Sequence, residues 1–224
     1  MEEMFAKEGL KWINTYYRDK DRNCIVIKIH KTNTEESYEI LIDEEDVDIV
    51  KQGIWRVINP RKNSHLKDTY NIQWTKRING KKINYEIYQL ILNTKGKSVV
   101  IDHINMNRFD NRKANLRICT PQINRVNQEA KGCYYEKQTG KYLARIKVNG
   151  KEINIGRYNT EREAEEIYLK CNILLGYDKI SFTIKEKIKE RNIALSEEDL
   201  ENKYIKKVYN FLNDIEEFSI EKAL

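Results

Sequence analysis

The chain has 224 residues, of which 40% are hydrophobic, 34% are charged and 10% are aromatic. This length predicts one or two domains, and the aromatic content favours packed cores over disorder. No apolar run approaches the roughly 18 residues needed to cross a bilayer, and the acidic N-terminal segment lacks the apolar stretch of a secretory signal. The four cysteines form no C-x-x-C pair. We therefore expect reduced thiols in a cytoplasmic protein, and neither a zinc ribbon nor a disulfide framework.

The net charge of +6 is distributed very unevenly along the chain. Residues 1–50 carry a net charge of −6, residues 51–160 carry +16, and residues 161–224 carry −4. The basic residues of the middle block alternate with polar and aromatic residues and do not follow one amphipathic helix. Nucleic acid is therefore the leading partner for this block, and an anionic membrane is a distant second.

The first half of the chain reads mostly as strands. Residues 24–30 and 38–42 are strand-like, and the acidic run 43–50 indicates the start of a helix, because carboxylates favour a helix N-terminus. Residues 69–92 contain two strand-like runs separated by Asn79-Gly80. This dipeptide predicts a hairpin with a type I′ turn, since both central residues need positive φ.

Residues 99–129 predict the order strand, loop, strand, helix. An apolar strand leads into Asp102-His103, and after an irregular polar loop the run 116–119 reads as a second strand. Thr120 and Pro121 look like the N-cap and the first residue of a helix. That helix carries Asn124 in its first turns.

Three strands and a helix are predicted between 132 and 175. Gln138-Thr139-Gly140 and Asn149-Gly150 separate the strands, and Thr160 with Glu163 forms a capping box for the helix. Beyond 181 the chain reads as helical again, with a last helix that is apolar along one side. We interpret that helix as a packing or dimerising element.

The phrase D-H-I-N-x-N-R-x-D-N-R-x-x-N-L-R between 102 and 117 resembles the HNH nucleases with a ββα-metal finger, in particular the phage and intron-encoded homing type. The matching residues are His103, Asn115 and Asn124. The resemblance implies phosphodiester hydrolysis that leaves 5′-phosphate and 3′-hydroxyl ends. Asn124 stands where many HNH enzymes have histidine, which predicts weaker metal affinity.

The chemistry suits these residue types. His103 titrates near neutrality and can act as general base, and the amide oxygen of Asn115 could hold its ring. Oxygen ligands from Asp102 and Asn124 suit one Mg²⁺ or Mn²⁺ ion, and the resemblance implies the same roles. Asn127 is the substitute ligand if the helix register differs.

Other polar residues of the chain have plain structural roles as an alternative to functional ones. For His30 and His65 we expect structural roles, and for Asp110 and Asn111 the stabilisation of turns. Three arginines flank the predicted site and are candidates for phosphate contact, with Arg117 favoured and the other two about even against simple solvation. The three are Arg117, Arg112 and Arg125.

Residues 132–178 resemble an AP2-type DNA-binding domain, in which three antiparallel strands pack on one helix and the sheet enters the major groove. Because apolar side chains alternate along 141–148, the intervening basic ones should face outward. Arg145 is the first candidate for a base contact. The supporting candidates are Tyr135, Lys137, Lys141, Lys147 and Arg157.

Together these features predict an α+β protein with an N-terminal β-rich segment (1–40), a nuclease domain (41–130), an AP2-like domain (131–180) and a helical extension (181–224). The expected function is site-recognising cleavage or nicking of double-stranded DNA by a monomer in a bacterial or phage-infected cytoplasm, as expected of a homing endonuclease. Two alternatives stay open. One is a DNA-binding regulator that has lost catalysis, and the other is an enzyme that acts on RNA or on DNA without sequence preference.

Overall fold

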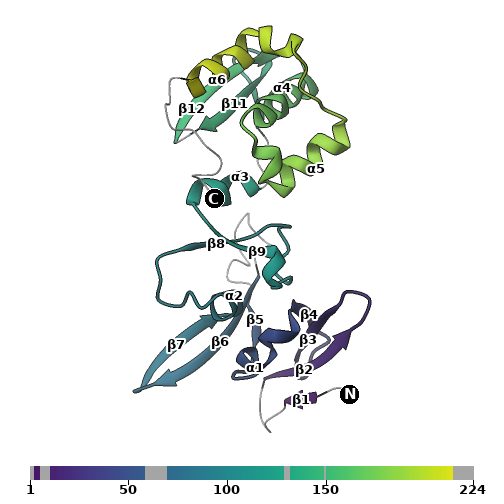
Figure 1. Ribbon diagram of the computed structural model, residues 1–224, viewed down its shortest axis with the longest axis vertical. Helices are drawn as coiled ribbons and strands as arrows, with labels where there is room; N and C mark the ends of the chain where they lie inside the picture. Colours follow the sequence, from purple (N-terminus) through teal and green to yellow (C-terminus); the bar gives the residue numbers. More distant parts are fainter. Residues whose placement is uncertain (1–2, 6–10, 59–69, 129–131, 149, 214–224) are drawn as a thin grey trace. The chain divides into compact units, whose positions relative to one another are not determined.

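A computed structural model describes residues 3–5, 11–58, 70–128, 132–148 and 150–213 (Figure 1). It divides into two compact units, the first made of residues 1–103 and 107–118 and the second of residues 104–106 and 119–224. Both contain small sheets and several helices, which agrees with the predicted α+β class. Every helix among the described residues is too short or too polar to span a bilayer. The four-part domain division stays a prediction.

The first unit begins with a four-stranded antiparallel sheet. Its strands lie in sequence order and are β1 (Glu3–Phe5), β2 (Trp12–Asp19), β3 (Cys24–Lys31) and β4 (Ser37–Ile42). Ile27, Ile29, Ile40 and Ile42 are fully buried and form the centre of this unit's core. Leu41 is buried on the opposite face, with Cys24 and Val26. The two predicted strands of this region are confirmed as β3 and β4.

A short helical segment follows β4 and leads to the central tryptophan of the core. The acidic run forms a 3₁₀ turn, η1 (Glu44–Asp46), and a helix, α1 (Val47–Val50), which confirms the predicted helix start. Trp55 is fully buried. The side chain of Asn14 accepts a hydrogen bond from the Trp55 backbone N at 2.6 Å and donates one to its carbonyl at 3.0 Å. A buried polar residue of β2 thus fixes the chain where it leaves α1.

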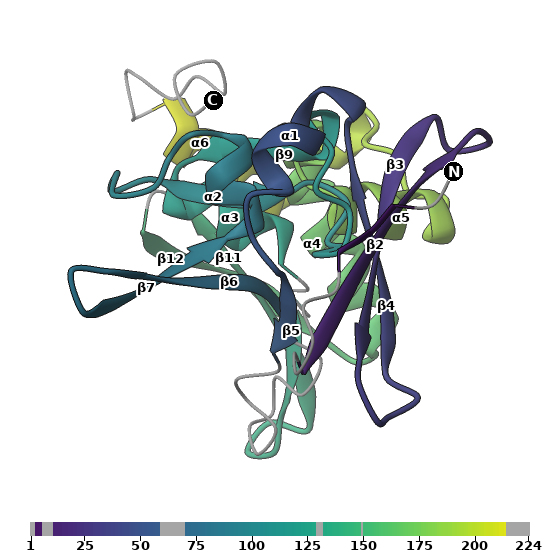
Figure 2. The same ribbon diagram turned by 90° about the horizontal axis from the view of Figure 1, so that it is seen from below.

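The predicted hairpin is present as β6 (Asn71–Ile78) and β7 (Lys81–Glu86), with β5 (Arg56–Ile58) beside β6. Asn79 and Gly80 have φ values of 50° and 77°, as the type I′ prediction requires. The hairpin projects away from the N-terminal sheet (Figure 2). After β7 the chain forms the helix α2 (Ile87–Ile91), so the apolar end of this run is helical and not extended.

The order strand, loop, strand, helix predicted for 99–129 is confirmed. The elements are β8 (Val100–His103), a 3₁₀ turn η2 (Lys113–Asn115), β9 (Leu116–Cys119) and α3 (Pro121–Asn127). β8 and β9 pair as a two-stranded sheet. Thr120 is the N-cap of α3, and its hydroxyl accepts a hydrogen bond from the Ile123 backbone N at 3.3 Å.

The second unit has a three-stranded antiparallel sheet of β10 (Cys133–Glu136), β11 (Lys141–Val148) and β12 (Lys151–Tyr158), followed by the helix α4 (Glu161–Leu174). Both hydrogen bonds of the predicted capping box at Thr160 are present. Alternate residues of β11, Ala144, Ile146 and Val148, are buried in the core that α4 covers. The predicted three strands and one helix are therefore confirmed.

Two 3₁₀ turns and two helices follow α4 among the described residues of the second unit. They are η3 (Tyr177–Lys179), α5 (Phe182–Arg191), η4 (Glu198–Glu201) and α6 (Lys203–Asn213). Ile205 and Val208 of α6 are fully buried in the same core as the α4 side chains. The interpretation of the last helix as a packing element is confirmed, while dimerisation through it stays a prediction.

Candidate active site and nucleic-acid interface

The loop after β8 is held by main-chain hydrogen bonds to the N-terminal sheet. The Leu41 N–H donates to the Phe109 carbonyl and the Asn111 N–H donates to the Leu41 carbonyl, both at 2.8 Å. The Phe109 ring also contacts Tyr38 and Tyr70, with ring centroids 5.8 Å and 5.5 Å apart. A loop that is fixed by β4 and by an aromatic cluster can keep its polar side chains in one arrangement.

His103 ends β8 and has only 9% of its surface exposed. Its Nε2 lies 3.2 Å from the Oδ1 of Asn111, and its ring is nearly perpendicular to that of Tyr88, with the centroids 5.6 Å apart. Since the Nδ2 of Asn111 donates to the Arg108 carbonyl at 3.0 Å, the amide oxygen must be the atom that faces the ring. The proton therefore lies on Nε2, and Nδ1 carries the lone pair of the neutral imidazole.

Burial lowers the pKa of His103 below its ordinary value, and the hydrogen bond with Asn111 offsets part of this effect. A lowered pKa keeps the imidazole neutral at neutral pH. Only the neutral ring can accept a proton, so the burial of His103 favours the function of a general base.

We expect Asn115 to hold the His103 ring, but in the structure Asn111 makes this contact. Asn111 is fully buried and both stabilises the turn, as predicted, and holds the His103 ring. Asn115 is buried too, and its Nδ2 donates to the Asp110 carbonyl at 2.8 Å. Sequence reasoning missed the role of Asn111 because an asparagine in a polar loop has turn formation as its ordinary explanation. The catalytic role of Asn115 stays a prediction.

Asp102 and Arg117 form an ion pair across the two-stranded sheet. The Oδ2 of Asp102 accepts hydrogen bonds from the Arg117 Nη2 at 2.6 Å and Nε at 3.0 Å, and the aspartate has 5% of its surface exposed. We had expected Asp102 to bind a metal ion and Arg117 to bind phosphate. In the structure the two side chains bind each other. Metal binding by Asp102 and phosphate binding by Arg117 would therefore both involve side chains that already form this ion pair.

The donor chemistry of the predicted metal ligands fits a hard divalent cation. Asp102 offers a carboxylate with several lone pairs and Asn124 a neutral amide oxygen, which are ligand types of Mg²⁺ and Mn²⁺. Asn124 lies on α3, which belongs to the second unit, whereas Asp102 belongs to the first. Within the part of the chain that the structure describes, no three His, Cys, Asp or Glu side chains come together as a metal site. The side chain of the substitute ligand Asn127 donates to the Ile104 carbonyl and accepts from the Phe182 backbone N. It therefore holds together three segments of the second unit.

The other two arginines that the sequence predicts to flank the site differ in their surroundings. Arg112 donates to both carboxylate oxygens of Asp110, at 2.8 Å and 2.7 Å. Arg125 is exposed on α3 and makes no ion pair with a described residue. Of the three arginines, Arg125 is therefore the one whose charge is most accessible. His30 is half-buried on β3, and His65 lies outside the described residues.

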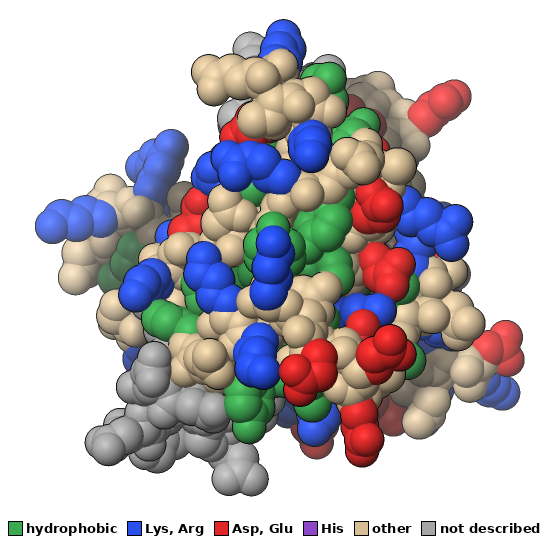
Figure 3. Space-filling model, turned by 90° about the horizontal axis from the view of Figure 1, so that it is seen from above, with side chains coloured by type: hydrophobic (Ala, Val, Ile, Leu, Met, Phe, Trp, Pro, Cys, Tyr) green, Lys and Arg blue, Asp and Glu red, His purple; other side chains and the backbone are tan. Residues whose placement is uncertain are grey.

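The outward face of the second sheet carries cross-strand ion pairs. Arg145 pairs with Glu152 at 2.5 Å and lies over the ring of Tyr134, and Arg157 forms two hydrogen bonds with Glu136. Arg157 and Thr139 lower the pKa of Glu136 to about 2, so its carboxylate stays ionised. Tyr135, Lys137, Lys141 and Lys147 are exposed. On the face of the molecule seen in Figure 3, basic side chains lie among acidic ones.

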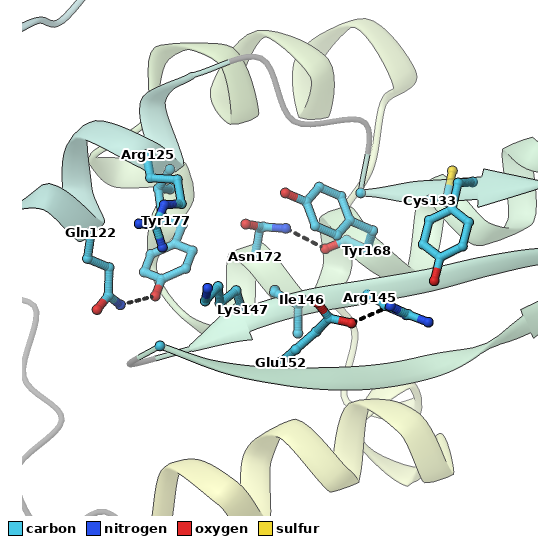
Figure 4. A pocket seen from close by; sticks show the side chains of 14 residues that line it. Gln122, Arg125, Cys133, Arg145, Ile146, Lys147, Glu152, Tyr168, Asn172 and Tyr177 are labelled. Atoms are coloured by element: carbon cyan, nitrogen blue, oxygen red, sulfur yellow. Dashed lines mark hydrogen bonds and ion pairs between the residues drawn. The ribbon is translucent and has the colours of Figure 1, made fainter.

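Three of the predicted DNA-binding residues line one cavity of about 380 Å³ in the second unit (Figure 4). Arg125 comes from α3, and Arg145 and Lys147 come from β11. Two hydrogen bonds also involve residues that line the cavity: the amide of the buried Asn172 donates to the Tyr168 carbonyl at 2.7 Å, and the amide of the half-buried Gln122 donates to the Tyr177 hydroxyl at 2.9 Å. The structure thus places in one cavity residues from two predicted domains, Arg125 from 41–130 and Arg145 and Lys147 from 131–180.

The chain resembles one viral protein over part of its length. Over 86 residues it is 35% identical to an uncharacterized HNH endonuclease of Acanthamoeba polyphaga mimivirus. The match includes 37% of this chain and 46% of the relative, so it spans about half the length of that protein. No family model matches the chain. No solved structure matches it either.

Proposed function

We propose that the chain is a metal-dependent DNA endonuclease or nickase of the HNH type. The observation that carries the proposal is His103, which is buried, has its pKa lowered by that burial, and is held by Asn111 in a loop fixed to β4. The partial likeness to a viral protein named as an HNH endonuclease supports the same conclusion. The basic middle block of the chain supports DNA as the substrate.

In the proposed reaction His103 is the general base. Its Nδ1 takes a proton from a water molecule as the water oxygen attacks the phosphorus atom. The bond from phosphorus to the 3′ oxygen breaks, and the leaving oxygen takes a proton from solvent, which gives a 5′-phosphate and a 3′-hydroxyl. Asn111 and Asn115 hold the ring and its loop. A divalent ion, Mg²⁺ or Mn²⁺, bound by Asp102 and Asn124 would neutralise charge that develops on the phosphate and the leaving group.

The second sheet is the proposed DNA-reading element, in the manner of an AP2 domain. Arg145 is the candidate for base contact, and its position over Tyr134 and beside Glu152 limits its movement. Arg125 and Lys147 at the rim of the cavity are candidates for phosphate contact, because neither makes an ion pair with a described residue. Recognition of a defined site by a monomer, as in a homing endonuclease, is part of the proposal.

A DNA-binding regulator without catalysis is the second candidate. It is favoured by one observation, the engagement of Asp102 with Arg117, because this pair competes with metal binding. The two candidates share the DNA-binding surface and differ only in hydrolysis.

The test is nicking of supercoiled plasmid with Mg²⁺ or Mn²⁺, using DNA that includes the sequences flanking the gene. We expect the wild type to nick, His103→Ala to lose activity and the matched control His30→Ala to keep it. If no DNA is cut in either metal, the enzyme proposal fails and the regulator is favoured. If His103→Ala cuts as well as the wild type, the assignment of the general base is wrong.

A further inference from the structure

The β6–β7 hairpin has a basic end that none of the roles described above uses. Lys76 and Arg77 lie near the end of β6, and Lys81 and Lys82 lie at the start of β7. All four side chains are exposed, and none of them makes an ion pair with a described residue. Ile78, next to the turn, is exposed as well. A small projecting element therefore presents four positive charges and an apolar side chain.

This arrangement of charge works against the stability of the hairpin. Arg77 and Lys82 are direct cross-strand partners, and like charges at such positions repel each other. Lys81 and Lys82 are also adjacent to the turn that both strands share. Lys76 lies over the Trp74 ring, 5.7 Å from its centroid. Arg77, Lys81 and Lys82 form no ion pair with a described residue, so a ligand of opposite charge is the natural explanation for them.

The base of the hairpin is rigid, in contrast to its charged end. Trp74 and Tyr85 are cross-strand partners with stacked rings 5.0 Å apart, and Thr75 donates to Asn84 at 2.7 Å on the next pair. Arg56 of β5 donates to the Thr75 hydroxyl at 2.5 Å. Each cross-strand pair near the base is thus connected through side chains. A rigid ribbon can place its charged end without a large loss of conformational entropy.

We propose that the β6–β7 hairpin is a DNA-binding arm that enters a groove of duplex DNA, separate from the second sheet. A two-stranded antiparallel ribbon fits the width of the major groove. In this position Lys76, Arg77, Lys81 and Lys82 contact phosphates from both faces of the ribbon, because successive residues of a strand point to opposite faces. The inference rests on the proposed function only in taking DNA as the ligand.

The experiment compares the full-length wild type with the variant Lys76→Gln/Arg77→Gln/Lys81→Gln/Lys82→Gln. Binding to a labelled linear duplex is measured in EDTA, so that no cleavage is involved, at several salt concentrations between about 50 and 200 mM. The slope of log K against log[salt] should fall by about 0.9 for each phosphate contact that is lost. We expect a decrease of two to four contacts, or roughly 1.8 to 3.6 in the slope.

The matched control removes four exposed cations from the acidic C-terminal third, Arg162, Lys179, Lys185 and Lys189, each changed to Gln. It lowers the net charge by the same amount and should keep most of the wild-type slope. If the control loses as much as the hairpin variant, the effect is one of net charge and the proposal is wrong. A hairpin variant with the wild-type slope would also overturn it.

A second measurement separates binding from folding. Because Lys82→Gln removes the repulsion of Arg77, its thermal unfolding midpoint should equal or exceed that of the wild type while DNA affinity falls. A lower midpoint would overturn the claim that the charges oppose stability. If the wild type nicks no plasmid, the proposed nuclease function fails, but the salt slope and the unfolding midpoint still test the hairpin. If the hairpin variants bind DNA as well as the wild type, the hairpin proposal fails and the nuclease proposal is unaffected.

Discussion

The arginine–carboxylate pairs beside β8 and β9 lie in a setting opposite to that of the pairs on the second sheet. Between β8 and β9, Arg117 pairs with Asp102 across the two strands, and Arg112 pairs with Asp110 in the loop that joins them; both aspartates are buried. On the second sheet, Arg145 pairs with Glu152 and Arg157 with Glu136, and the side chains of all four are partly or largely exposed. Breaking a pair in the first region would leave a buried charge without its partner, so these pairs hold the structure together. The exposed pairs of the second sheet contribute little to stability, and their arginines could leave the carboxylates to bind a ligand.

The largest difference is expected when one arginine is removed from each region. Arg117→Gln takes two hydrogen bonds from the buried Asp102 carboxylate and should lower the free energy of unfolding by about 2–4 kcal/mol. Arg157→Gln should leave the unfolding midpoint within error of the wild type, because water solvates Glu136. Urea unfolding of the two variants in parallel measures the contrast. Equal losses would show that burial is not what separates the two regions.

Asn111→Ala should have the next largest effect. It removes a buried amide that donates to Arg108 and holds His103, and we expect a loss of about 2 kcal/mol in unfolding free energy together with a strong decrease in plasmid nicking. Asn210→Ala, on the exposed side of α6, is the control and should change neither quantity. Full activity in Asn111→Ala would mean that His103 needs no partner at this position.

The pH dependence of stability should come from His103. Burial lowers its pKa in the folded protein, so the unfolded chain binds a proton more readily than the folded chain does. The stabilising contribution is therefore complete above the unfolded pKa of about 6.5 and is lost as the pH falls from there toward the lowered folded value. Unfolding in EDTA between pH 8 and pH 5, compared with His103→Gln, measures it; the variant should lose less stability on acidification. An equal loss in both would contradict this assignment.

The smallest effect on stability is expected at Lys141 on the second sheet. Lys141→Gln should leave the unfolding midpoint unchanged and reduce the salt slope of DNA binding by about 0.9, as expected for one phosphate contact. A change in stability without a change in slope would place Lys141 with the structural residues of the first region.

Most local elements could be predicted from the sequence because their signals are local. Asn79-Gly80 specifies its turn by backbone geometry, Thr160 with Glu163 caps α4, and the alternation along β11 separates buried from exposed side chains. The partner of His103 could not be predicted in this way. Asn111 and Asn115 are both asparagines of one polar loop, and the loop's hydrogen bonds to β4 decide which of them faces the ring. The ion pair of Asp102 with Arg117 depends likewise on the pairing of two strands that are 12 residues apart.

The main-chain hydrogen bonds of Leu41 to Phe109 and Asn111 limit where the chain can be truncated and which segment can be transferred to another protein. A fragment that starts at the apolar strand before Asp102 would retain all the motif residues. It would lack the strand that accepts the loop, and so the imidazole would have no fixed partner. Any attempt to transplant the proposed site onto another protein therefore has to carry β4 along with the motif.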